Sequence, residues 1–382
     1  MQDIDGHRSQ PEVVNPENFF NGVRRNASFL ETVMNRNVLW LMPGILSIVG
    51  FLFYTVSSLT EEYLVPRTEW GQPDLQGVWN FSSDIPMERP EHFGEREFLN
   101  EEEIAELLAP QSAANDDNAE QAPLPAGEVG KTYDDFWNEQ TARDNSFRTS
   151  HIVYPKNGRV PQLQDGVTVQ FGTRGVEKTA ERPARHLARG IGIDGPEDRG
   201  LSERCLVGFN AGPPFTPSVY NNNVQIFQSK DTVAIMTEMI HEARIVPLYD
   251  SEESFVSLHD DVRLYTGDSR GYWDGDTLVV VTKNFNSLTA SFGGLAANLG
   301  LPGTSYNKVL TEKFIRVGPS SINYEFTIDD RATYTDKFTG IIPIAKIDGL
   351  LYEYACHEGN YAMLYMLRGA RVQEADASFT SN

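Results

Sequence analysis

The sequence predicts a mainly β protein, in which an antiparallel meander closes as a barrel after one N-terminal transmembrane helix. Three observations predict this fold. An uncharged apolar stretch lies near the N-terminus, runs rich in Val, Ile, Thr and Phe follow one another from Asn222 onward, and Asp-Gly and Gly-Pro turns separate those runs. Sequential hairpins without intervening helices favour a barrel or a sandwich.

The predicted transmembrane helix is Val38–Leu59, a stretch of 22 residues without a charge. About 20 apolar residues are enough to cross the hydrocarbon core of a bilayer. Arg24, Arg25 and Arg36 precede the stretch, whereas Arg67 alone provides a nearby positive charge after it. Because positive residues stay on the cytoplasmic side, we expect a cytoplasmic N-terminus and a periplasmic or extracellular domain. The long segment before the stretch and the lack of an A-x-A site after it argue against a cleaved signal.

We therefore expect a single-pass protein of the cell (inner) membrane whose parts follow one another along the chain. They are a cytoplasmic tail (1–37), the transmembrane helix (38–59), a linker (60–72), an exported β-rich domain (73–372) with an irregular, acidic and partly helical insert at about 88–200, and a C-terminal tail (373–382).

The composition limits the partners. The chain has 382 residues, a formal net charge of −22 and a pI near 4.7. Nucleic-acid binding and broad docking on anionic lipid headgroups both need clustered Lys and Arg, so the acidic balance argues against them. The expected partner is the lipid bilayer, through Val38–Leu59, and the oligomeric state stays open.

The exported part begins with a short strand and a helix. Leu75, Gly77, Trp79 and Phe81 alternate as strand residues do, and Glu101–Leu108 has the acidic first turn of an amphipathic helix. A basic run at 174–189 has helical i, i+4 spacing, which is typical of a solvated helix face.

Seven later runs predict strands. They are Val224–Phe227, Thr232–Pro247, Thr277–Asn284, Val309–Val317, Ile322–Ile328, Phe338–Ile347 and Leu350–Cys356. Asp274-Gly275 and Asp348-Gly349 predict two-residue hairpins, because Asp-Gly supplies the positive φ angles that such turns need. A longer hairpin is expected at 318–321.

Cys205 and Cys356 are 151 positions apart, too far for a CxxC motif. They are either two buried thiols or one disulfide, and the disulfide is favoured in an oxidising compartment. A bridge would bring the charges at 198–205, Arg204 among them, beside His357 and Glu358. This juxtaposition predicts one composite site.

Four polar groups are candidates for chemistry or ligand binding. In the predicted strand Thr232–Pro247, His241 shares an apolar face with Ile235, Met239 and Ile245, whereas Glu242 and Arg244 lie on the opposite face and can pair. His241 is thus either a hydrogen-bonded core residue or a general base in an apolar cavity. His357 and Glu358 follow a predicted strand beside Asn360 and Tyr361, and they either act on a ligand or cap a turn.

The third group is Asp268 and Arg270, between Gly267 and Gly271. Arg270 could clamp an anion, but an internal ion pair is the commoner role for such a turn. Asn221, Asn222 and Asn223 either satisfy loop backbone groups or line a polar pocket. There is no His-x-His, HExxH, Rossmann or P-loop pattern, so we expect neither a metal nor a nucleotide cofactor.

Six sequence blocks resemble a large family of uncharacterised exported bacterial proteins. The blocks are PDLQGVW (73–79), GPEDRGLSERCLVGFNAGPP (195–214), YNNNVQIFQ (220–228), EMIHEARIVPL (238–248), GDSRGYWDGDTLVV (267–280) and YEYACHEGNYAMLYMLRGAR (352–371). The resemblance implies export and names no reaction. Members usually carry a cleavable export signal, whereas this chain has the uncharged stretch.

A second resemblance is to lipocalin-like barrels, which begin with Gly-x-Trp and end with an Arg across that Trp. Gly77-Val78-Trp79 stands near the start of the domain, and Arg368 and Arg371 stand near its end. A cation over an indole face is physically favourable. The resemblance implies a lipocalin-like barrel with Arg368 or Arg371 packed on Trp79.

Three functions follow from these expectations. An enclosed β cavity fits a module that binds a small apolar or amphipathic molecule near the membrane. The alternative is a cofactor-independent hydrolase, lyase or isomerase that uses His241 or His357 with Glu358 and Arg270. The third is an envelope scaffold or assembly subunit.

Overall fold

The computed structural model describes residues 63–108, 146–167, 195–196, 201–202, 204–218, 220–286 and 304–380. The described residues, all from Tyr63 onward, belong to one compact unit. The predicted transmembrane helix at 38–59 and the basic run at 174–189 lie outside the described residues. Within the described ranges, no helix combines the length and apolar character needed to cross a bilayer.

Strands dominate the described part of the chain. They are β1 (Gly77–Asn80), β2 (Ile152–Tyr154), β3 (Asn223–Gln228), β4 (Thr232–Thr237), β5 (Ala243–Tyr249), β6 (Asp268–Asp274), β7 (Thr277–Lys283), β8 (Val309–Gly318), β9 (Ser321–Asp329) and β10 (Phe338–Ile347). The helical elements are η1 (Glu91–Phe93), α3 (Glu101–Leu108), η4 (Met239–His241), η5 (Glu252–Ser254) and α4 (Tyr361–Thr380). The predicted helix at 101–108 is confirmed as α3.

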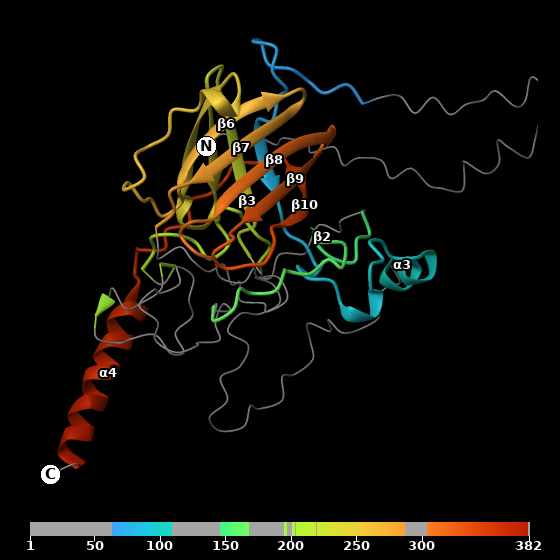
Figure 1. The fold of residues 1–382 in the computed structure, drawn as a ribbon. Helices are drawn as coiled ribbons and strands as arrows, with labels where there is room; N and C mark the ends of the chain where they lie inside the picture. The colour runs from blue at the N-terminus through green and yellow to red at the C-terminus, as the bar shows by residue number, and fades with distance from the viewer. Residues whose placement is uncertain are drawn as a thin grey trace, which may run out of the picture. The chain divides into compact units, whose positions relative to one another are not determined.

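Nine of the described strands, β1 and β3 to β10, close into a barrel (Figure 1). Closure comes from β1 and β10, where Val78 pairs with Ile347, while β2 pairs with the other end of β10. The barrel is mixed, because β5 and β6 are parallel, with Leu248 opposite Gly271. The prediction of a mainly β barrel is confirmed. The expectation of a purely antiparallel meander is wrong at this pair. The parallel pair also distinguishes this barrel from lipocalins, which are up-and-down barrels.

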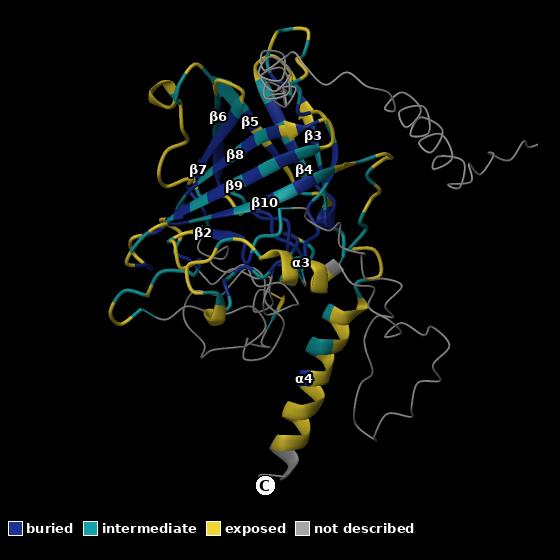
Figure 2. Ribbon diagram, turned by 90° about the vertical axis from the view of Figure 1, so that its right-hand side faces the viewer, coloured by how far each residue is buried: buried dark blue, intermediate teal, exposed yellow. Residues whose placement is uncertain are grey.

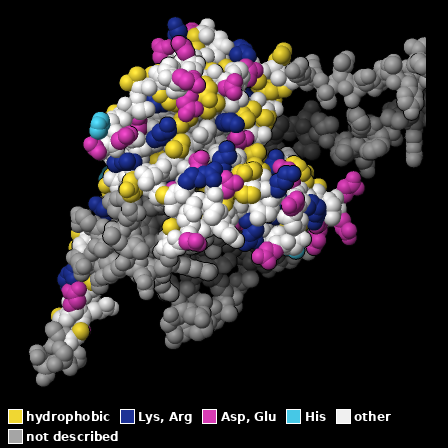
Figure 3. Space-filling view, in the orientation of Figure 1, with side chains coloured by type: hydrophobic (Ala, Val, Ile, Leu, Met, Phe, Trp, Pro, Cys, Tyr) yellow, Lys and Arg dark blue, Asp and Glu magenta, His cyan; other side chains and the backbone are white. Residues whose placement is uncertain are grey.

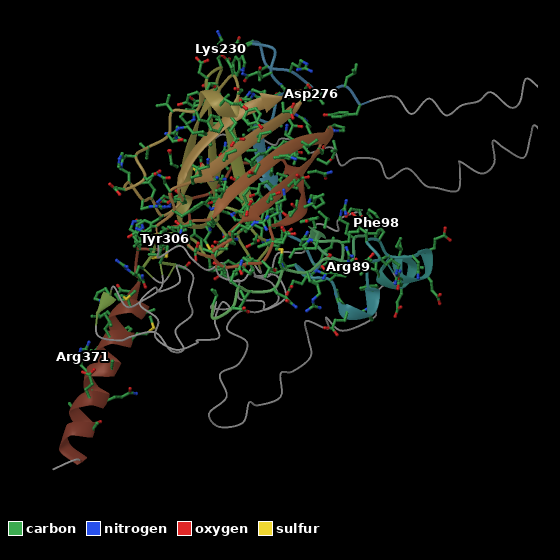
Figure 4. All side chains as sticks on the ribbon, viewed as in Figure 1. Arg89, Phe98, Lys230, Asp276, Tyr306 and Arg371 are labelled. Atoms are coloured by element: carbon green, nitrogen blue, oxygen red, sulfur yellow. A yellow bond between two sulfur atoms is a disulfide. The ribbon has the colours of Figure 1, made fainter. Side chains whose placement is uncertain are left out.

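Two predicted hairpins are confirmed. Asp274 pairs with Thr277 across the turn that contains Gly275, whose φ is +59°, and Gly318 pairs with Ser321 across the longer loop. Figure 4 shows Lys230, in the β3–β4 loop, and Asp276 at one end of the barrel. The first described residues lie at this end, because Arg67 forms a 2.6 Å ion pair with Asp276.

The strands alternate between a buried interior and a more exposed exterior (Figure 2). The interior core includes Trp79, Phe81, Phe314 and Tyr324, all fully buried. On the face shown in Figure 3, acidic and basic side chains are interspersed with apolar ones. The alternation predicted from the sequence thus separates core from surface.

The segment 210–218, which contains three proline residues, is buried throughout and inserts Phe215 into the barrel. The Phe215 ring stacks on Tyr324 with centroids 3.9 Å apart and lies 4.8 Å from the ring of Phe81. Stacked and offset aromatic pairs add roughly 0.5–1.5 kcal/mol beyond their buried area. These aromatic side chains therefore fill part of the described barrel interior.

The indole of Trp79 has two cationic neighbours, Arg316 and Lys346, but neither is a predicted one. Arg316, on β8, lies 5.6 Å from the Trp79 ring and also donates to the carbonyl of Pro319. Arg371 lies on α4 and pairs with Glu374 instead. The assignment of Arg368 or Arg371 to this role is wrong, because the chain becomes a helix after residue 360 rather than a last barrel strand.

Two strand predictions are also wrong. The run Thr232–Pro247 is interrupted at residues 238–242, where Ile240 and His241 have φ values of +63° and +44°. β4 and β5 form a hairpin around this interruption, with Ile235 opposite Arg244. The run Leu350–Cys356 has no strand, and α4 follows it, so Asp348-Gly349 is not a hairpin turn.

Candidate functional site

Three chain segments meet around one disulfide. The bond between Cys205 and Cys356, predicted from the sequence, is confirmed. It joins the turns at 201–208 to the turn at 354–360. The third segment is the β4–β5 turn, because His241 and His357 lie with their ring centroids 6.3 Å apart in an edge-to-face arrangement. We call the two rings the histidine pair.

The β4–β5 turn lies at the barrel end opposite Lys230, because β4 runs from one end to the other. Backbone hydrogen bonds close the turn: Thr237 N–H donates to Glu242 O at 3.0 Å, and His241 N–H donates to Glu238 O at 3.1 Å. The turn interrupts the strand alternation from which a buried position was predicted for His241. The side chain is therefore exposed rather than buried among apolar residues. Both roles predicted for His241, a core residue or a general base in an apolar cavity, assumed a buried side chain, and that assumption is wrong.

The second member, His357, is exposed beside the disulfide. Asn360 Nδ2 donates to Cys205 Sγ at 3.3 Å, which ties the turn to the bridge. Arg204 and Glu358 adjoin Cys205 and His357 in the chain. Tyr361 begins α4, and its exposed ring lies 6.3 Å from that of Tyr365.

Glu242 supplies a carboxyl group next to His241. Its Oε1 accepts from Thr266 Oγ1 at 3.4 Å. Burial raises the pKa of Glu242, although the Thr266 hydrogen bond and the charges of Arg244 and His241 act in the opposite direction. A carboxyl group that holds its proton above the usual range can act as a general acid. The exposed corner where these three segments meet therefore combines two imidazoles with a carboxyl group of raised pKa.

Arg244 does not pair with Glu242 as predicted. Its side chain points into the barrel, where Nη1 and Nη2 contact the two carboxylate oxygens of Glu312 at 2.6 and 2.8 Å. Tyr324 donates to the same carboxylate at 2.6 Å. We call Arg244, Glu312 and Tyr324 the interior cluster. Glu312 and Tyr324 were missed in the sequence, although Glu312 stands between Leu310 and Phe314 on the apolar face of its strand.

The pKa shifts in the interior cluster follow from burial and from Glu312. Burial raises the pKa of Tyr324 well above its usual value, and the adjacent carboxylate raises it further. Burial alone would lower the pKa of Arg244, but the charge and hydrogen bonds of Glu312 outweigh this effect and raise it. The phenol therefore stays protonated and the guanidinium stays charged, which suits a structural role.

Asp268 and Arg270 form the internal ion pair that the sequence favoured, with 2.5 Å between the charged atoms. Arg270 Nε also donates to Val256 O at 2.8 Å, and Asp268 Oδ2 accepts from Leu258 N–H at 3.0 Å. Both side chains thus fasten the loop between β5 and β6 to the start of β6. These contacts give Arg270 the internal ion-pairing role that the sequence favoured.

The three asparagines support loop structure. Asn222 is fully buried, and its amide bonds the backbone N–H and C=O of Ser218 at 2.7 and 2.8 Å. Asn223 donates to Glu238 at 2.8 Å, and Asn221 adopts a φ of +54°. Of the two roles left open for these amides, the one observed is hydrogen bonding within the protein.

The comparisons with known proteins add no relative. A scan against models of protein families, a search of curated proteins and a search of solved structures each found no match. Among the residues that the structure describes, no three or more His, Cys, Asp or Glu side chains are grouped to hold a metal ion.

Proposed function

We propose that the histidine pair is the centre of an acid–base enzyme of the hydrolase, lyase or isomerase type. The observation that carries this proposal is the 6.3 Å separation of the His241 and His357 rings, which come from distant parts of the chain. A reacting group or water between two imidazoles can donate a proton to one ring and accept a proton from the other. Neither role requires a cofactor.

Each neighbour has a distinct role in this proposal. His241 and His357 are the general acid and base, and Glu242 is the group that supplies or stores a proton beside His241. Asn360 positions the His357 turn through its contact with Cys205. The stacking of Phe215 on Tyr324 favours this exposed corner over the alternative of a ligand cavity inside the barrel.

The test is turnover of a panel of chromogenic esters, phosphate esters and glycosides, together with substrates that report elimination and isomerisation. His241→Gln and His357→Gln should each lower a detected rate by about 10²–10⁴-fold, the usual contribution of general acid–base catalysis. His259→Gln is the matched control, because His259 is exposed and contacts Asp261 at 3.3 Å. The proposal fails if no substrate is turned over or if all three variants keep the rate.

The protein's location is a separate proposal. We infer that Val38–Leu59 anchors the chain in the cell membrane with the barrel on the non-cytoplasmic side. The uncharged stretch and the preceding arginines support this topology, and the Cys205–Cys356 bond is the kind found in oxidising compartments. A C-terminal reporter enzyme that needs disulfides should be active in cells, and a reporter active only in the cytosol would contradict the topology.

A further inference from the structure

The two halves of the histidine pair are attached to the protein very differently. His241 belongs to the barrel, because the turn that carries it is bonded to β3 and β4: Glu238 N–H donates to Asn223 O at 2.9 Å. The 201–208 turns pack on the same place, since a Cβ added to Gly208 would lie 2.7 Å from Met239 Cγ. Cys205 is therefore held against the barrel independently of Cys356.

His357 belongs to a segment that buries few of its residues. After β10 ends at Ile347, residues 350–360 form no strand, and the side chains of Leu350 and Tyr352 are each 77% exposed. The described side chains of the following helix α4 are mostly exposed as well (Figure 2). Segments with few buried apolar contacts open at low free-energy cost.

Two contacts of the 354–360 turn lie at the disulfide. Cys356 Sγ lies 3.8 Å from Ser202 O, and Asn360 Nδ2 donates to the bonded Cys205 Sγ. Both contacts join the 354–360 turn to the residues around Cys205. The covalent bond is thus the strongest connection between the turn that carries His357 and the part of the molecule that carries His241.

We propose that the Cys205–Cys356 disulfide is a redox switch that assembles the histidine pair. A dithiol reductant transfers two electrons and two protons to the bridge, which breaks the S–S bond and leaves two thiols, while the reductant becomes a disulfide. The 351–380 segment then separates from Cys205, and His357 leaves His241. The barrel stays folded, because β1–β10 closure and the interior cluster do not involve the bridge. This switch rests on the proposed function, since it controls the same pair of residues.

Hydrogen–deuterium exchange of the full-length protein tests the switch. Adding dithiothreitol should raise amide exchange in 351–377 by about tenfold or more, while β8 and β9 keep their protection, because the released segment buries few of its residues whereas β8 and β9 belong to the barrel. The double variant Cys205→Ser/Cys356→Ser should match the reduced protein without reductant. Equal protection of 351–377 in both redox states overturns the proposal, and so does loss of protection in β8 and β9 together with that segment.

A second measurement separates this proposal from the enzyme proposal. In NMR spectra of the histidine rings, His241→Gln should shift the His357 signals in the oxidised protein and leave them unchanged in the reduced protein. If the ring contact is lost on reduction but His241→Gln leaves turnover intact, the enzyme proposal fails and the switch stands. If His241→Gln abolishes turnover but reduction changes neither exchange nor the His357 signals, the switch fails alone.

Discussion

The interior cluster and the histidine pair are both built from polar side chains of distant segments, yet their surroundings are opposite. In the interior cluster, Arg244 and Glu312 side chains are 6% and 0% exposed and bond each other at two points. His241 and His357 are both exposed, and their contact depends on a covalent bridge outside the barrel. The comparison separates a buried ion pair, whose two members satisfy each other away from water, from two imidazoles that solvent and ligands can reach.

The largest expected effect comes from breaking the interior cluster. Glu312→Gln leaves the guanidinium of Arg244 buried without its counter-charge, and losing one partner of such a pair costs about 3–5 kcal/mol. Urea unfolding should show this loss in the free energy of unfolding. Glu325→Gln is the control, because it removes a half-exposed pair with Lys313 that is worth at most about 1 kcal/mol. Similar losses in both variants would contradict the structural role of the interior cluster.

Removing the disulfide should have a smaller effect on the barrel. Closing a 151-residue loop in the unfolded chain stabilises by about 4–5 kcal/mol on the chain-entropy model. Breaking the bridge also frees the short link from Ile347 to Cys356 in the folded protein. This gain in conformational entropy stabilises the folded state and offsets about half of the loss. We therefore expect Cys205→Ser/Cys356→Ser to lower the free energy of unfolding by about 2–3 kcal/mol. A barrel that no longer folds would instead make the bridge part of its core.

The smallest expected effect concerns Glu242. Because the pKa of Glu242 is raised, the folded state binds this proton more tightly than the unfolded state does. The protonated carboxyl group therefore stabilises the fold at low pH, and this contribution is lost as the pH rises through the raised pKa. Glu242→Gln should thus stabilise the protein at neutral pH by less than about 1 kcal/mol, since the group is partly solvated. It should give no gain below the ordinary carboxyl range. Urea midpoints at the two pH values measure the difference, and a variant less stable at neutral pH would contradict the direction of the shift.

The features that the sequence predicted correctly are local or covalent. The first strand at Trp79, the helix at 101–108 and the hairpins at Gly275 and Pro319 each depend on residues close in the chain. The Asp268–Arg270 pair is equally local. The disulfide could be predicted despite its long range, because the chain has two cysteines and compartment chemistry favours joining them.

The features that could not be predicted depend on tertiary packing. The run 232–247 contains no Gly, and its one Pro lies near its end, yet the chain turns where Ile240 and His241 adopt positive φ angles. Barrel contacts such as that of Met239 with Gly208 favour this turn over the intrinsic preference for strand. The parallel β5–β6 pair and the position of Arg316 over Trp79 likewise could not be predicted, because the pattern of neighbouring residues in the sequence does not indicate either of them.

The central claim is that His241 and His357 act together, and a double-mutant cycle on turnover tests it most directly. Groups that act as one catalytic unit are strongly non-additive, so the double variant His241→Gln/His357→Gln should be no slower than the slower single variant. Rate losses that multiply in the double variant, or a double variant as fast as the unmodified protein, would contradict the claim.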